Sequence, residues 1–432
     1  MLPKSLPKLT LPKLSLLLVS ILAALALVSC QQAAPPTNLA ETKATPAPAE
    51  TAKKIAPTDL EALSNRLVTQ VAGVKEGEIV FVGGSARDLE LLENLATDVR
   101  KAGGFALVTL GSERMFKKYY EEVPDKYDSR SPDLQLKLAT LPAATINIDT
   151  NETDDAPNGI PPARLAAVGK AGQAVGDLYL KRSVRQVNVG NNLYPTADRA
   201  KQFGMSLDEL AKTFWESVNS DYSAIQTTGE KIKTDLSTGK EVHITNPNGT
   251  DLKVKIEGRP FFVSDGIISA DDVKKGGPAV SVYLPAGEVF CSPVPATAEG
   301  KIVESQTYFQ GKEVTNLTLT FVAGKMTGLT GSGPGFADLK AQYDAAEGNK
   351  DLFAFVDFGI NPNLKIWPTS KVGNWVQSGM VTVGIGNNTW AGGDNQVSFA
   401  IPVYSPGSSV TVDGKPLVQD GKLVTGEEVA NR

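Results

Sequence analysis

Short β-prone runs alternate with helical stretches between residues 79 and 189, and this alternation constrains the fold more than any other feature of the chain. The expected strands are 79–82, 105–110, 144–148 and 185–189, and the expected helices include 89–99 and 162–181. Strands that are joined by helices usually pair in parallel, because the crossover returns the chain in the same direction. The pattern therefore predicts an α/β domain with a mainly parallel sheet.

A glycine-rich turn, Gly83-Gly84-Ser85, is expected between the first strand and its helix. Such a turn could hold an anion at the helix N-terminus. It lacks both the dinucleotide-binding fingerprint and the lysine of a phosphate-binding loop. We therefore favour a plain strand-to-helix turn in which Ser85 caps the helix.

The second half of the chain has short alternating runs separated by turns, and only 337–346 looks helical there. Dipeptides typical of hairpins are Asn248-Gly249, Asp265-Gly266, Asp413-Gly414 and Asp420-Gly421. The helical pattern of 207–218 belongs to the first half. We predict an α/β domain at 58–225 and an α+β, β-rich domain with mostly antiparallel pairing at 226–432.

The N-terminal residues have the order of a secretory signal. Lys4, Lys8 and Lys13 form a basic region, and 14–28 is apolar apart from two serines. This run is too short to span a hydrocarbon core of about 30 Å comfortably. We predict a signal peptide at 1–29.

Leu27-Val28-Ser29-Cys30 resembles the bacterial lipobox, in which the cysteine is acylated and becomes the mature N-terminus. The prediction is an extracytoplasmic lipoprotein that lipid on Cys30 anchors to a membrane; an ordinary signal peptide is the alternative. Residues 30–57 are rich in Ala, Pro and Thr, which favours a disordered tether.

Charge and cysteine content exclude some classes of partner and scaffold. Removal of 1–29 takes three lysines and no acidic residue, which changes the formal net charge from −5 to −8. A chain this acidic is not expected to bind nucleic acid. If Cys30 is lipidated, Cys291 has no partner for a disulfide, and we interpret it as a small buried hydrophobic residue.

A series of short motifs runs through nearly the whole chain after the tether. The motifs are Leu193-Tyr194-Pro195-Thr196, Gly204-Met205-Ser206-Leu207, Gly249-Thr250-Asp251-Leu252, Gly258-Arg259-Pro260, Leu284-Pro285-Ala286-Gly287-Glu288-Val289-Phe290 and Gly392-Gly393-Asp394-Asn395. The series resembles the thermophilic metallo-aminopeptidase family, known as aminopeptidase T or leucyl aminopeptidase. That family also includes a dihydroxypyridine ring-cleaving dioxygenase, so the likeness does not fix the reaction.

The resemblance implies a homodimer whose C-terminal domain holds two divalent metals, such as zinc or cobalt, with glutamates, histidines and an aspartate. The family's first glutamate matches Glu288, and its second falls on Asp357. The first histidine falls on Thr382, and the final His-x-Asp falls on Ala400 and Pro402. Most of the family's metal ligands are therefore expected to be lost.

The chain contains one histidine, His243, so a site that needs two imidazoles cannot be built within one copy. We interpret His243 as an ordinary strand side chain rather than a relocated ligand. The remaining carboxylates could at most form an oxygen-rich site for calcium or magnesium. Glu288 and Asp357 could also serve as an acid/base pair of the glycosidase type, although a leftover carboxylate pair is favoured.

Two functions remain open. The favoured one is a membrane-anchored, catalytically degenerate aminopeptidase scaffold that needs no cofactor and that binds a peptide or another small ligand, or serves as an interaction module. The alternative is an active aminopeptidase with an altered metal site, which would release N-terminal residues. Loss of the metal ligands would remove the Lewis acid and the activated water together, which supports the first.

Overall fold

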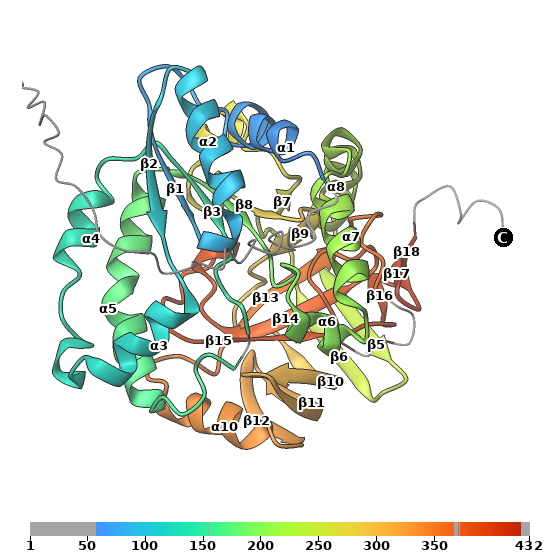
Figure 1. Cartoon of the computed structure of the whole chain (residues 1–432). Helices are drawn as coiled ribbons and strands as arrows, with labels where there is room; N and C mark the ends of the chain where they lie inside the picture. The colour runs from blue at the N-terminus through green and yellow to red at the C-terminus, as the bar shows by residue number, and fades with distance from the viewer. Residues whose placement is uncertain (1–57, 154, 367–369, 371, 425–432) are drawn as a thin grey trace, which may run out of the picture. The chain divides into compact units, whose positions relative to one another are not determined.

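Five strands form a sheet in the order β2-β1-β3-β4-β8, and every neighbouring pair is parallel (Figure 1). This computed structural model describes residues 58–153, 155–366, 370 and 372–424. The strands are β1 (Ile79–Gly84), β2 (Phe105–Leu110), β3 (Ala144–Ile148), β4 (Arg185–Val189) and β8 (Ser281–Leu284). The predicted parallel α/β sheet is confirmed.

Helices precede, connect and follow the strands of this sheet. They are α1 (Leu60–Arg66), α2 (Leu89–Lys101), α3 (Glu113–Glu122), α4 (Asp133–Leu138), α5 (Pro162–Lys181), α6 (Ala197–Phe203), α7 (Leu207–Val218) and α8 (Tyr222–Ser237), with short helical turns η1 (Leu67–Val71), η2 (Ala86–Asp88) and η3 (Asp125–Tyr127). Helix α2 contacts β1 and β2 and buries Leu92, Leu95 and Val99. These three buried residues form the face of the helix that covers the sheet.

The other strands of the described residues form two antiparallel sheets, as the β-rich prediction requires. One has eight strands in the order β12-β11-β10-β6-β5-β16-β17-β18, and the other has five in the order β15-β14-β13-β9-β7. Their strands are β5 (Glu241–Asn246), β6 (Thr250–Lys255), β7 (Phe262–Ser264), β9 (Glu288–Cys291), β10 (Glu299–Phe309), β11 (Lys312–Val322), β12 (Lys325–Ser332), β13 (Phe353–Gly359), β14 (Val381–Gly386), β15 (Ala400–Tyr404), β16 (Ser409–Val412), β17 (Lys415–Gln419) and β18 (Lys422–Leu423).

Several local expectations were wrong. Strand β1 continues through Gly83 and Gly84, so the turn begins at Ser85, whose hydroxyl donates to Asp88 rather than capping the helix backbone. Asp265-Gly266 follows β7 without forming a hairpin, because β7 pairs with the distant β9. The second half also contains α9 (Ala270–Lys275), η4 (Gly277–Val280) and η5 (Thr389–Ala391) besides the expected helix, α10 (Phe336–Ala345).

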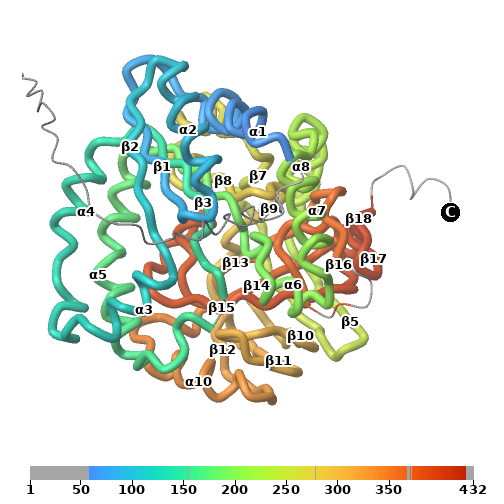
Figure 2. The backbone as a smooth tube through the Cα atoms, in the orientation of Figure 1, coloured from blue at the N-terminus to red at the C-terminus, as the bar shows by residue number. Residues whose placement is uncertain are grey.

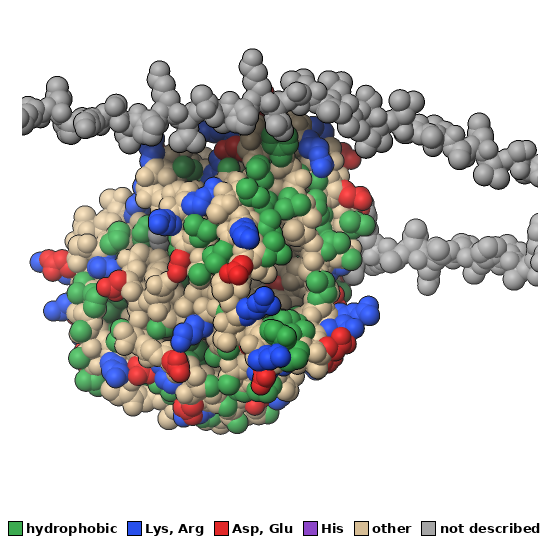
Figure 3. Space-filling view, turned by 90° about the vertical axis from the view of Figure 1, so that its left-hand side faces the viewer, with side chains coloured by type: hydrophobic (Ala, Val, Ile, Leu, Met, Phe, Trp, Pro, Cys, Tyr) green, Lys and Arg blue, Asp and Glu red, His purple; other side chains and the backbone are tan. Residues whose placement is uncertain are grey.

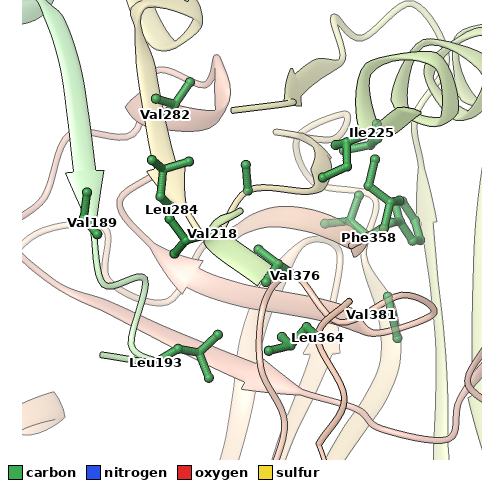
Figure 4. Close-up of a cluster of buried hydrophobic side chains, with 14 of the residues drawn as sticks. Val189, Leu193, Val218, Ile225, Val282, Leu284, Phe358, Leu364, Val376 and Val381 are labelled. Atoms are coloured by element: carbon green, nitrogen blue, oxygen red, sulfur yellow. The ribbon is translucent and has the colours of Figure 1, made fainter. Parts of the chain in front are cut away.

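A continuous hydrophobic core joins the parallel sheet to the five-stranded antiparallel sheet. Figure 4 shows Val189 of β4 and Leu284 of β8 in one cluster with Ile225 of α8 and Phe358 of β13. Strand β8 comes from the second half of the chain yet belongs to the first sheet. In Figure 2 the yellow part of the chain passes from β8 to β9 and so from one sheet to the other. The division into two domains after residue 225 stays a prediction.

The described residues all belong to one of the chain's two compact units, Lys53–Arg432. Within them, no helix is both long and apolar enough to cross a membrane. Figure 3 shows one face of this part of the chain, on which basic, acidic and hydrophobic side chains are intermixed. The signal peptide, Cys30 and the tether lie outside the described residues.

Candidate functional site

A cavity of about 770 Å³ lies between the carboxyl ends of the parallel strands and one face of the five-stranded antiparallel sheet, here called the cavity sheet. Ligands of open α/β sheets commonly bind at this end of the strands. A neighbouring cavity of about 640 Å³ shares Asn192, Ala400 and Pro402 with it. Of the positions that the family resemblance singled out, Glu288, Ala400 and Pro402 therefore border open space.

One row of side chains crosses the whole parallel sheet and faces this cavity. The strand register aligns Thr109 of β2, Gly83 of β1, Asn147 of β3, Asn188 of β4 and Tyr283 of β8, each of them the next-to-last residue of its strand. All five line the cavity. We call this set the polar row. Its glycine, Gly83, leaves room for the side chain of the neighbouring Asn147, whose Oδ1 would lie 2.7 Å from an added Cβ.

The loop after β3 is held firmly at the edge of the cavity. Asp149 accepts a hydrogen bond from the backbone of Asn151 at 2.9 Å, and its other oxygen lies 3.4 Å from Arg199 Nη1. Arg87 donates to the carbonyl of Asn151 at 2.8 Å. The negative charge of Asp149 is thus compensated within the protein.

The cavity sheet brings the five family positions together on one face. Asp357 of β13 stands opposite Thr382 of β14, and Gly384, two residues further along β14, stands opposite Pro402 of β15. Side chains two residues apart on a strand share a face. Phe290 of β9 pairs with Asp357, so Glu288, two residues before Phe290, lies on the same face. By the same rule, Ala400 lies on the face of Pro402. That these are the family's ligand positions stays a prediction.

Glu288 lines the cavity, with only 4% of its surface exposed. Asn191 Nδ2 donates a hydrogen bond to Glu288 Oε1 at 2.8 Å. Burial raises the pKa of Glu288 to about 7, against the smaller, opposite effect of the Asn191 amide. This carboxyl group is therefore protonated in a substantial fraction of the molecules near neutral pH.

Asp357 lies beneath the cavity and is fully buried. Burial, and then the negative charge of Glu288, hold the pKa of Asp357 well above its usual value. Neither oxygen of Asp357, nor the hydroxyl of Thr382 beside it, makes a hydrogen bond of normal geometry to a described residue. Such unpartnered polar atoms are uncommon in protein interiors, and each calls for an explanation such as a catalytic role or a bound water or ion.

Aromatic rings form the wall of the cavity next to Glu288. The ring centroids of Phe355 and Trp390 are 4.8 Å apart, and those of Phe355 and Trp375 are 5.5 Å apart. The indole planes of Trp375 and Trp390 are 89° apart. These are two of the four tryptophans in the chain, and both are only partly buried, so part of each ring can face a ligand.

The residues on this face do not fit the two-metal centre that the resemblance implies. Glu288 and Asp357 are the two carboxylates on it, while Thr382, Ala400 and Pro402 offer no imidazole or carboxylate. Among the described residues, no group of three or more His, Cys, Asp and Glu side chains could hold a metal ion. The donor set is therefore too small for two divalent ions.

The other candidate residues lie away from the cavity or in the core. His243 is on β5 of the eight-stranded sheet, where its Nε2 lies 2.7 Å from Asp251 Oδ1. Cys291 is fully buried, and burial raises the pKa of its thiol far above the usual range, which leaves it unreactive. Both agree with the interpretations drawn from the sequence.

The polar row and the aromatic wall were missed in the sequence. One signal was available, because asparagine is the next-to-last residue in both the 144–148 and the 185–189 runs. A polar residue within a buried parallel strand is unusual, since such strands read as nearly continuous hydrophobic runs. The rings of Phe355, Trp375 and Trp390 gave no comparable signal, because large aromatic residues are equally common in cores.

Comparisons with known proteins give the family. The model of the thermophilic metalloprotease family M29 matches residues 57–357, which is more than half of the chain and ends before Thr382, Ala400 and Pro402. A sequence comparison with curated proteins gave no match.

Two solved structures share the fold. AmpT from Thermus thermophilus superposes with a TM-score of 0.64 at 17% identity, over 85% of this chain and 99% of its own. A 2,5-dihydroxypyridine dioxygenase from Pseudomonas putida KT2440 superposes with a TM-score of 0.51 at 14% identity, over 86% of this chain and 99% of its own. From the matched family model, the chain belongs to the M29 family of thermophilic metalloproteases.

Proposed function

We propose that this chain is a catalytically inactive member of the M29 family that binds a small ligand in the cavity between its parallel sheet and its cavity sheet. The observation that carries the proposal is the donor set on the cavity sheet. A metallopeptidase needs a Lewis acid and a metal-activated water, which fixed nitrogen and oxygen ligands must hold. Thr382, Ala400 and Pro402 supply none of these ligands beside Glu288 and Asp357.

The environment of the two carboxyl groups supports the same conclusion. Burial favours the protonated form of both, as the raised pKa values of Glu288 and Asp357 indicate. A protonated carboxyl group is a poor metal ligand, because ligands bind in their deprotonated form. The cavity itself is retained, at about 770 Å³, which is within the range of small-molecule sites.

The proposal also includes the location and the partners expected from the sequence. Lipid on Cys30 would hold the protein at a membrane, outside the cytoplasm, with 30–57 as a tether. We propose a homodimer, by analogy with the family, and no nucleic-acid partner.

Metal content and peptidase turnover test the loss of activity. The full chain is purified in detergent, incubated with zinc, cobalt or manganese, and dialysed. We expect no stoichiometric metal by elemental analysis and no hydrolysis of leucyl p-nitroanilide, whereas AmpT from Thermus thermophilus serves as the positive control. Stoichiometric metal together with turnover would overturn the proposal.

An altered-site aminopeptidase is the second candidate, and the unpartnered oxygens of Asp357 and Thr382 favour it. These oxygens could serve as ligands of a metal ion that is held differently from the family's two metals. In that case Glu288→Ala would abolish both the bound metal and the turnover. The exposed Glu121→Ala on α3 is the matched control, since it removes the same group away from the cavity.

A further inference from the structure

We propose that the ligand of this cavity is a neutral saccharide. The inference rests on the proposed function, because it names the chemical class of the ligand for that same site. It depends on three properties of the described residues that line the cavity: amide and hydroxyl groups that are free to bond a ligand, no lysine or arginine, and partly exposed indole rings.

The polar row offers hydrogen-bonding groups that the protein does not use. The side chain of Asn188 and the hydroxyl of Tyr283 make no hydrogen bond to a described residue, and Asn147 has only a long contact of 3.4 Å with Thr145. A carboxamide both donates and accepts, as a sugar hydroxyl does. Neighbouring strands are about 4.8 Å apart, so Asn147, Asn188 and Tyr283 on three adjacent strands present such groups at that spacing.

The charge of the cavity suits a neutral ligand. No lysine or arginine is among the described residues that line it, so it offers no ion-pair partner for a carboxylate or a phosphate. Of its two lining carboxyl groups, Asp149 is already paired with Arg199. Glu288 is the other, and its Oε1 accepts a hydrogen bond from Asn191 Nδ2 at 2.8 Å.

The indole rings provide the apolar surface that a pyranose needs. The hydroxyl groups of a sugar lie around the ring, while its C–H groups form an apolar face that can stack on an aromatic side chain. Trp375 and Trp390 stand nearly perpendicular to each other at the cavity, with ring centroids 6.2 Å apart. The site thus combines apolar walls with a few placed polar groups, as binding sites for small molecules do.

A peptide fits the cavity less well. Its free carboxylate would find no lysine or arginine among the described residues of the lining. Peptides commonly add to a free strand edge through their main chain, and the edge strand at this cavity is β15. Pro402 lies within β15 and has no N–H, so this edge lacks one of the donors that strand addition uses.

Titration of the detergent-purified full chain with neutral trisaccharides tests the inference. The probes are maltotriose, cellotriose, laminaritriose and triacetylchitotriose, and Leu-Gly-Gly is the peptide comparison. Binding is measured by calorimetry and by tryptophan fluorescence, since two of the four tryptophans face the cavity. We expect saturable binding of at least one trisaccharide with a change in fluorescence, and none of Leu-Gly-Gly.

Two variants locate the binding site. Asn188→Leu and Thr109→Val keep the side-chain shape and remove polar atoms of the polar row, and each should weaken saccharide binding by about tenfold or more, which is about 1.4 kcal/mol. The matched control is Asn65→Leu on the exposed side of α1, which should change the affinity by less than about twofold. Thermal unfolding shows which variants are folded. If Asn188→Leu does not fold, Thr109→Val still tests the site, because Thr109 is exposed.

The outcomes separate this inference from the proposed function. If no trisaccharide binds, or if Asn188→Leu and Thr109→Val bind it as the wild type does, the saccharide inference is wrong. Binding of Leu-Gly-Gly that Asn188→Leu weakens would also overturn it, yet would leave an inactive ligand-binding protein in place. Hydrolysis of leucyl p-nitroanilide would instead remove the proposed function.

Discussion

Asp357 and Thr382 face each other across neighbouring antiparallel strands in the interior, and neither side chain makes a hydrogen bond of normal geometry to a described residue. Both are fully buried. An unpartnered polar group in the interior costs free energy of folding, because it gives up hydrogen bonds to water and gains none. The pair therefore lowers the stability of the cavity sheet.

Thr382→Val should stabilise the protein. The change keeps the shape of the side chain and removes the unpartnered hydroxyl, so we expect the free energy of unfolding to rise by about 1 kcal/mol. Urea unfolding of wild type and variant measures it. Thr227→Val is the control, because the exposed Thr227 hydroxyl donates to the carbonyl of Ser223. A loss of stability in Thr382→Val would mean that the hydroxyl has a partner.

Stability should fall as the pH rises from about 4 to about 7. Below its unfolded-state pKa near 4.5, Glu288 is protonated in both the folded and the unfolded state, so folding does not bury a charge. Above it, the unfolded state releases the proton while the folded state, with a pKa of about 7, retains it. The contribution of Glu288 to the free energy of unfolding is therefore present at low pH and is lost as the pH rises through the folded-state pKa of about 7. The loss from this group is roughly 3 kcal/mol.

The pH dependence has a matched pair of variants. Glu288→Gln preserves the acceptor for Asn191 and removes the titrating group, so it should flatten the decline in urea-unfolding free energy between pH 4.5 and 7. Asp357, whose pKa is raised further, should leave a residual slope. The exposed Glu121→Gln should behave like the wild type. An unchanged slope in Glu288→Gln would refute the assignment.

Restoring the missing ligands should recover metal binding only in part. In Thr382→His, Ala400→His and Pro402→Asp combined, all three new side chains point to the face of Glu288 and Asp357. Metal ligands must lie within about 0.2 Å of ideal distances, which three substitutions alone do not secure. We expect weak zinc binding by calorimetry and no turnover; tight, stoichiometric zinc with turnover would show that the lost ligands are all that separates this chain from an active enzyme.

Cys30→Ala should prevent anchoring. A signal peptidase for lipoproteins acts after the thiol is acylated, so the variant should remain unprocessed or leave the membrane fraction. Fractionation and mass spectrometry of the N-terminus measure both. The wild type should be released by detergent and carry lipid on Cys30. Normal processing and retention of Cys30→Ala without lipid would exclude the lipoprotein prediction.

The order of strands and helices could be predicted because it depends on local periodicity. The bounds of β2, β3, β4, α5 and α7 agree with the predicted ranges. Strand β1 extends to Gly84 because β2 and β3 pair with it on both sides, which no local pattern records. Helix α9 is only six residues long, too short for periodicity to reveal. Strand β15 continues through Pro402, because an edge strand tolerates a missing N–H.

The candidate site was predicted only where a motif marked it. Glu288 stands in a recognisable motif, and the structure places it at the cavity. The polar row depends on the register of five strands, and Tyr283 joins it from 95 residues after Asn188, as their pairing shows. Such an alignment is a property of the folded sheet and not of any one segment.

Strand β8 ends at Leu284 and strand β9 begins at Glu288, so a single short segment carries Tyr283 on one wall of the cavity and Glu288 on the other. The core in Figure 4 packs behind both walls. We therefore expect the two walls to move together and the pocket to keep its shape when a ligand binds. Binding should therefore cost little free energy for reorganisation of the protein. We expect association in a single step, with an observed rate that rises linearly with ligand concentration.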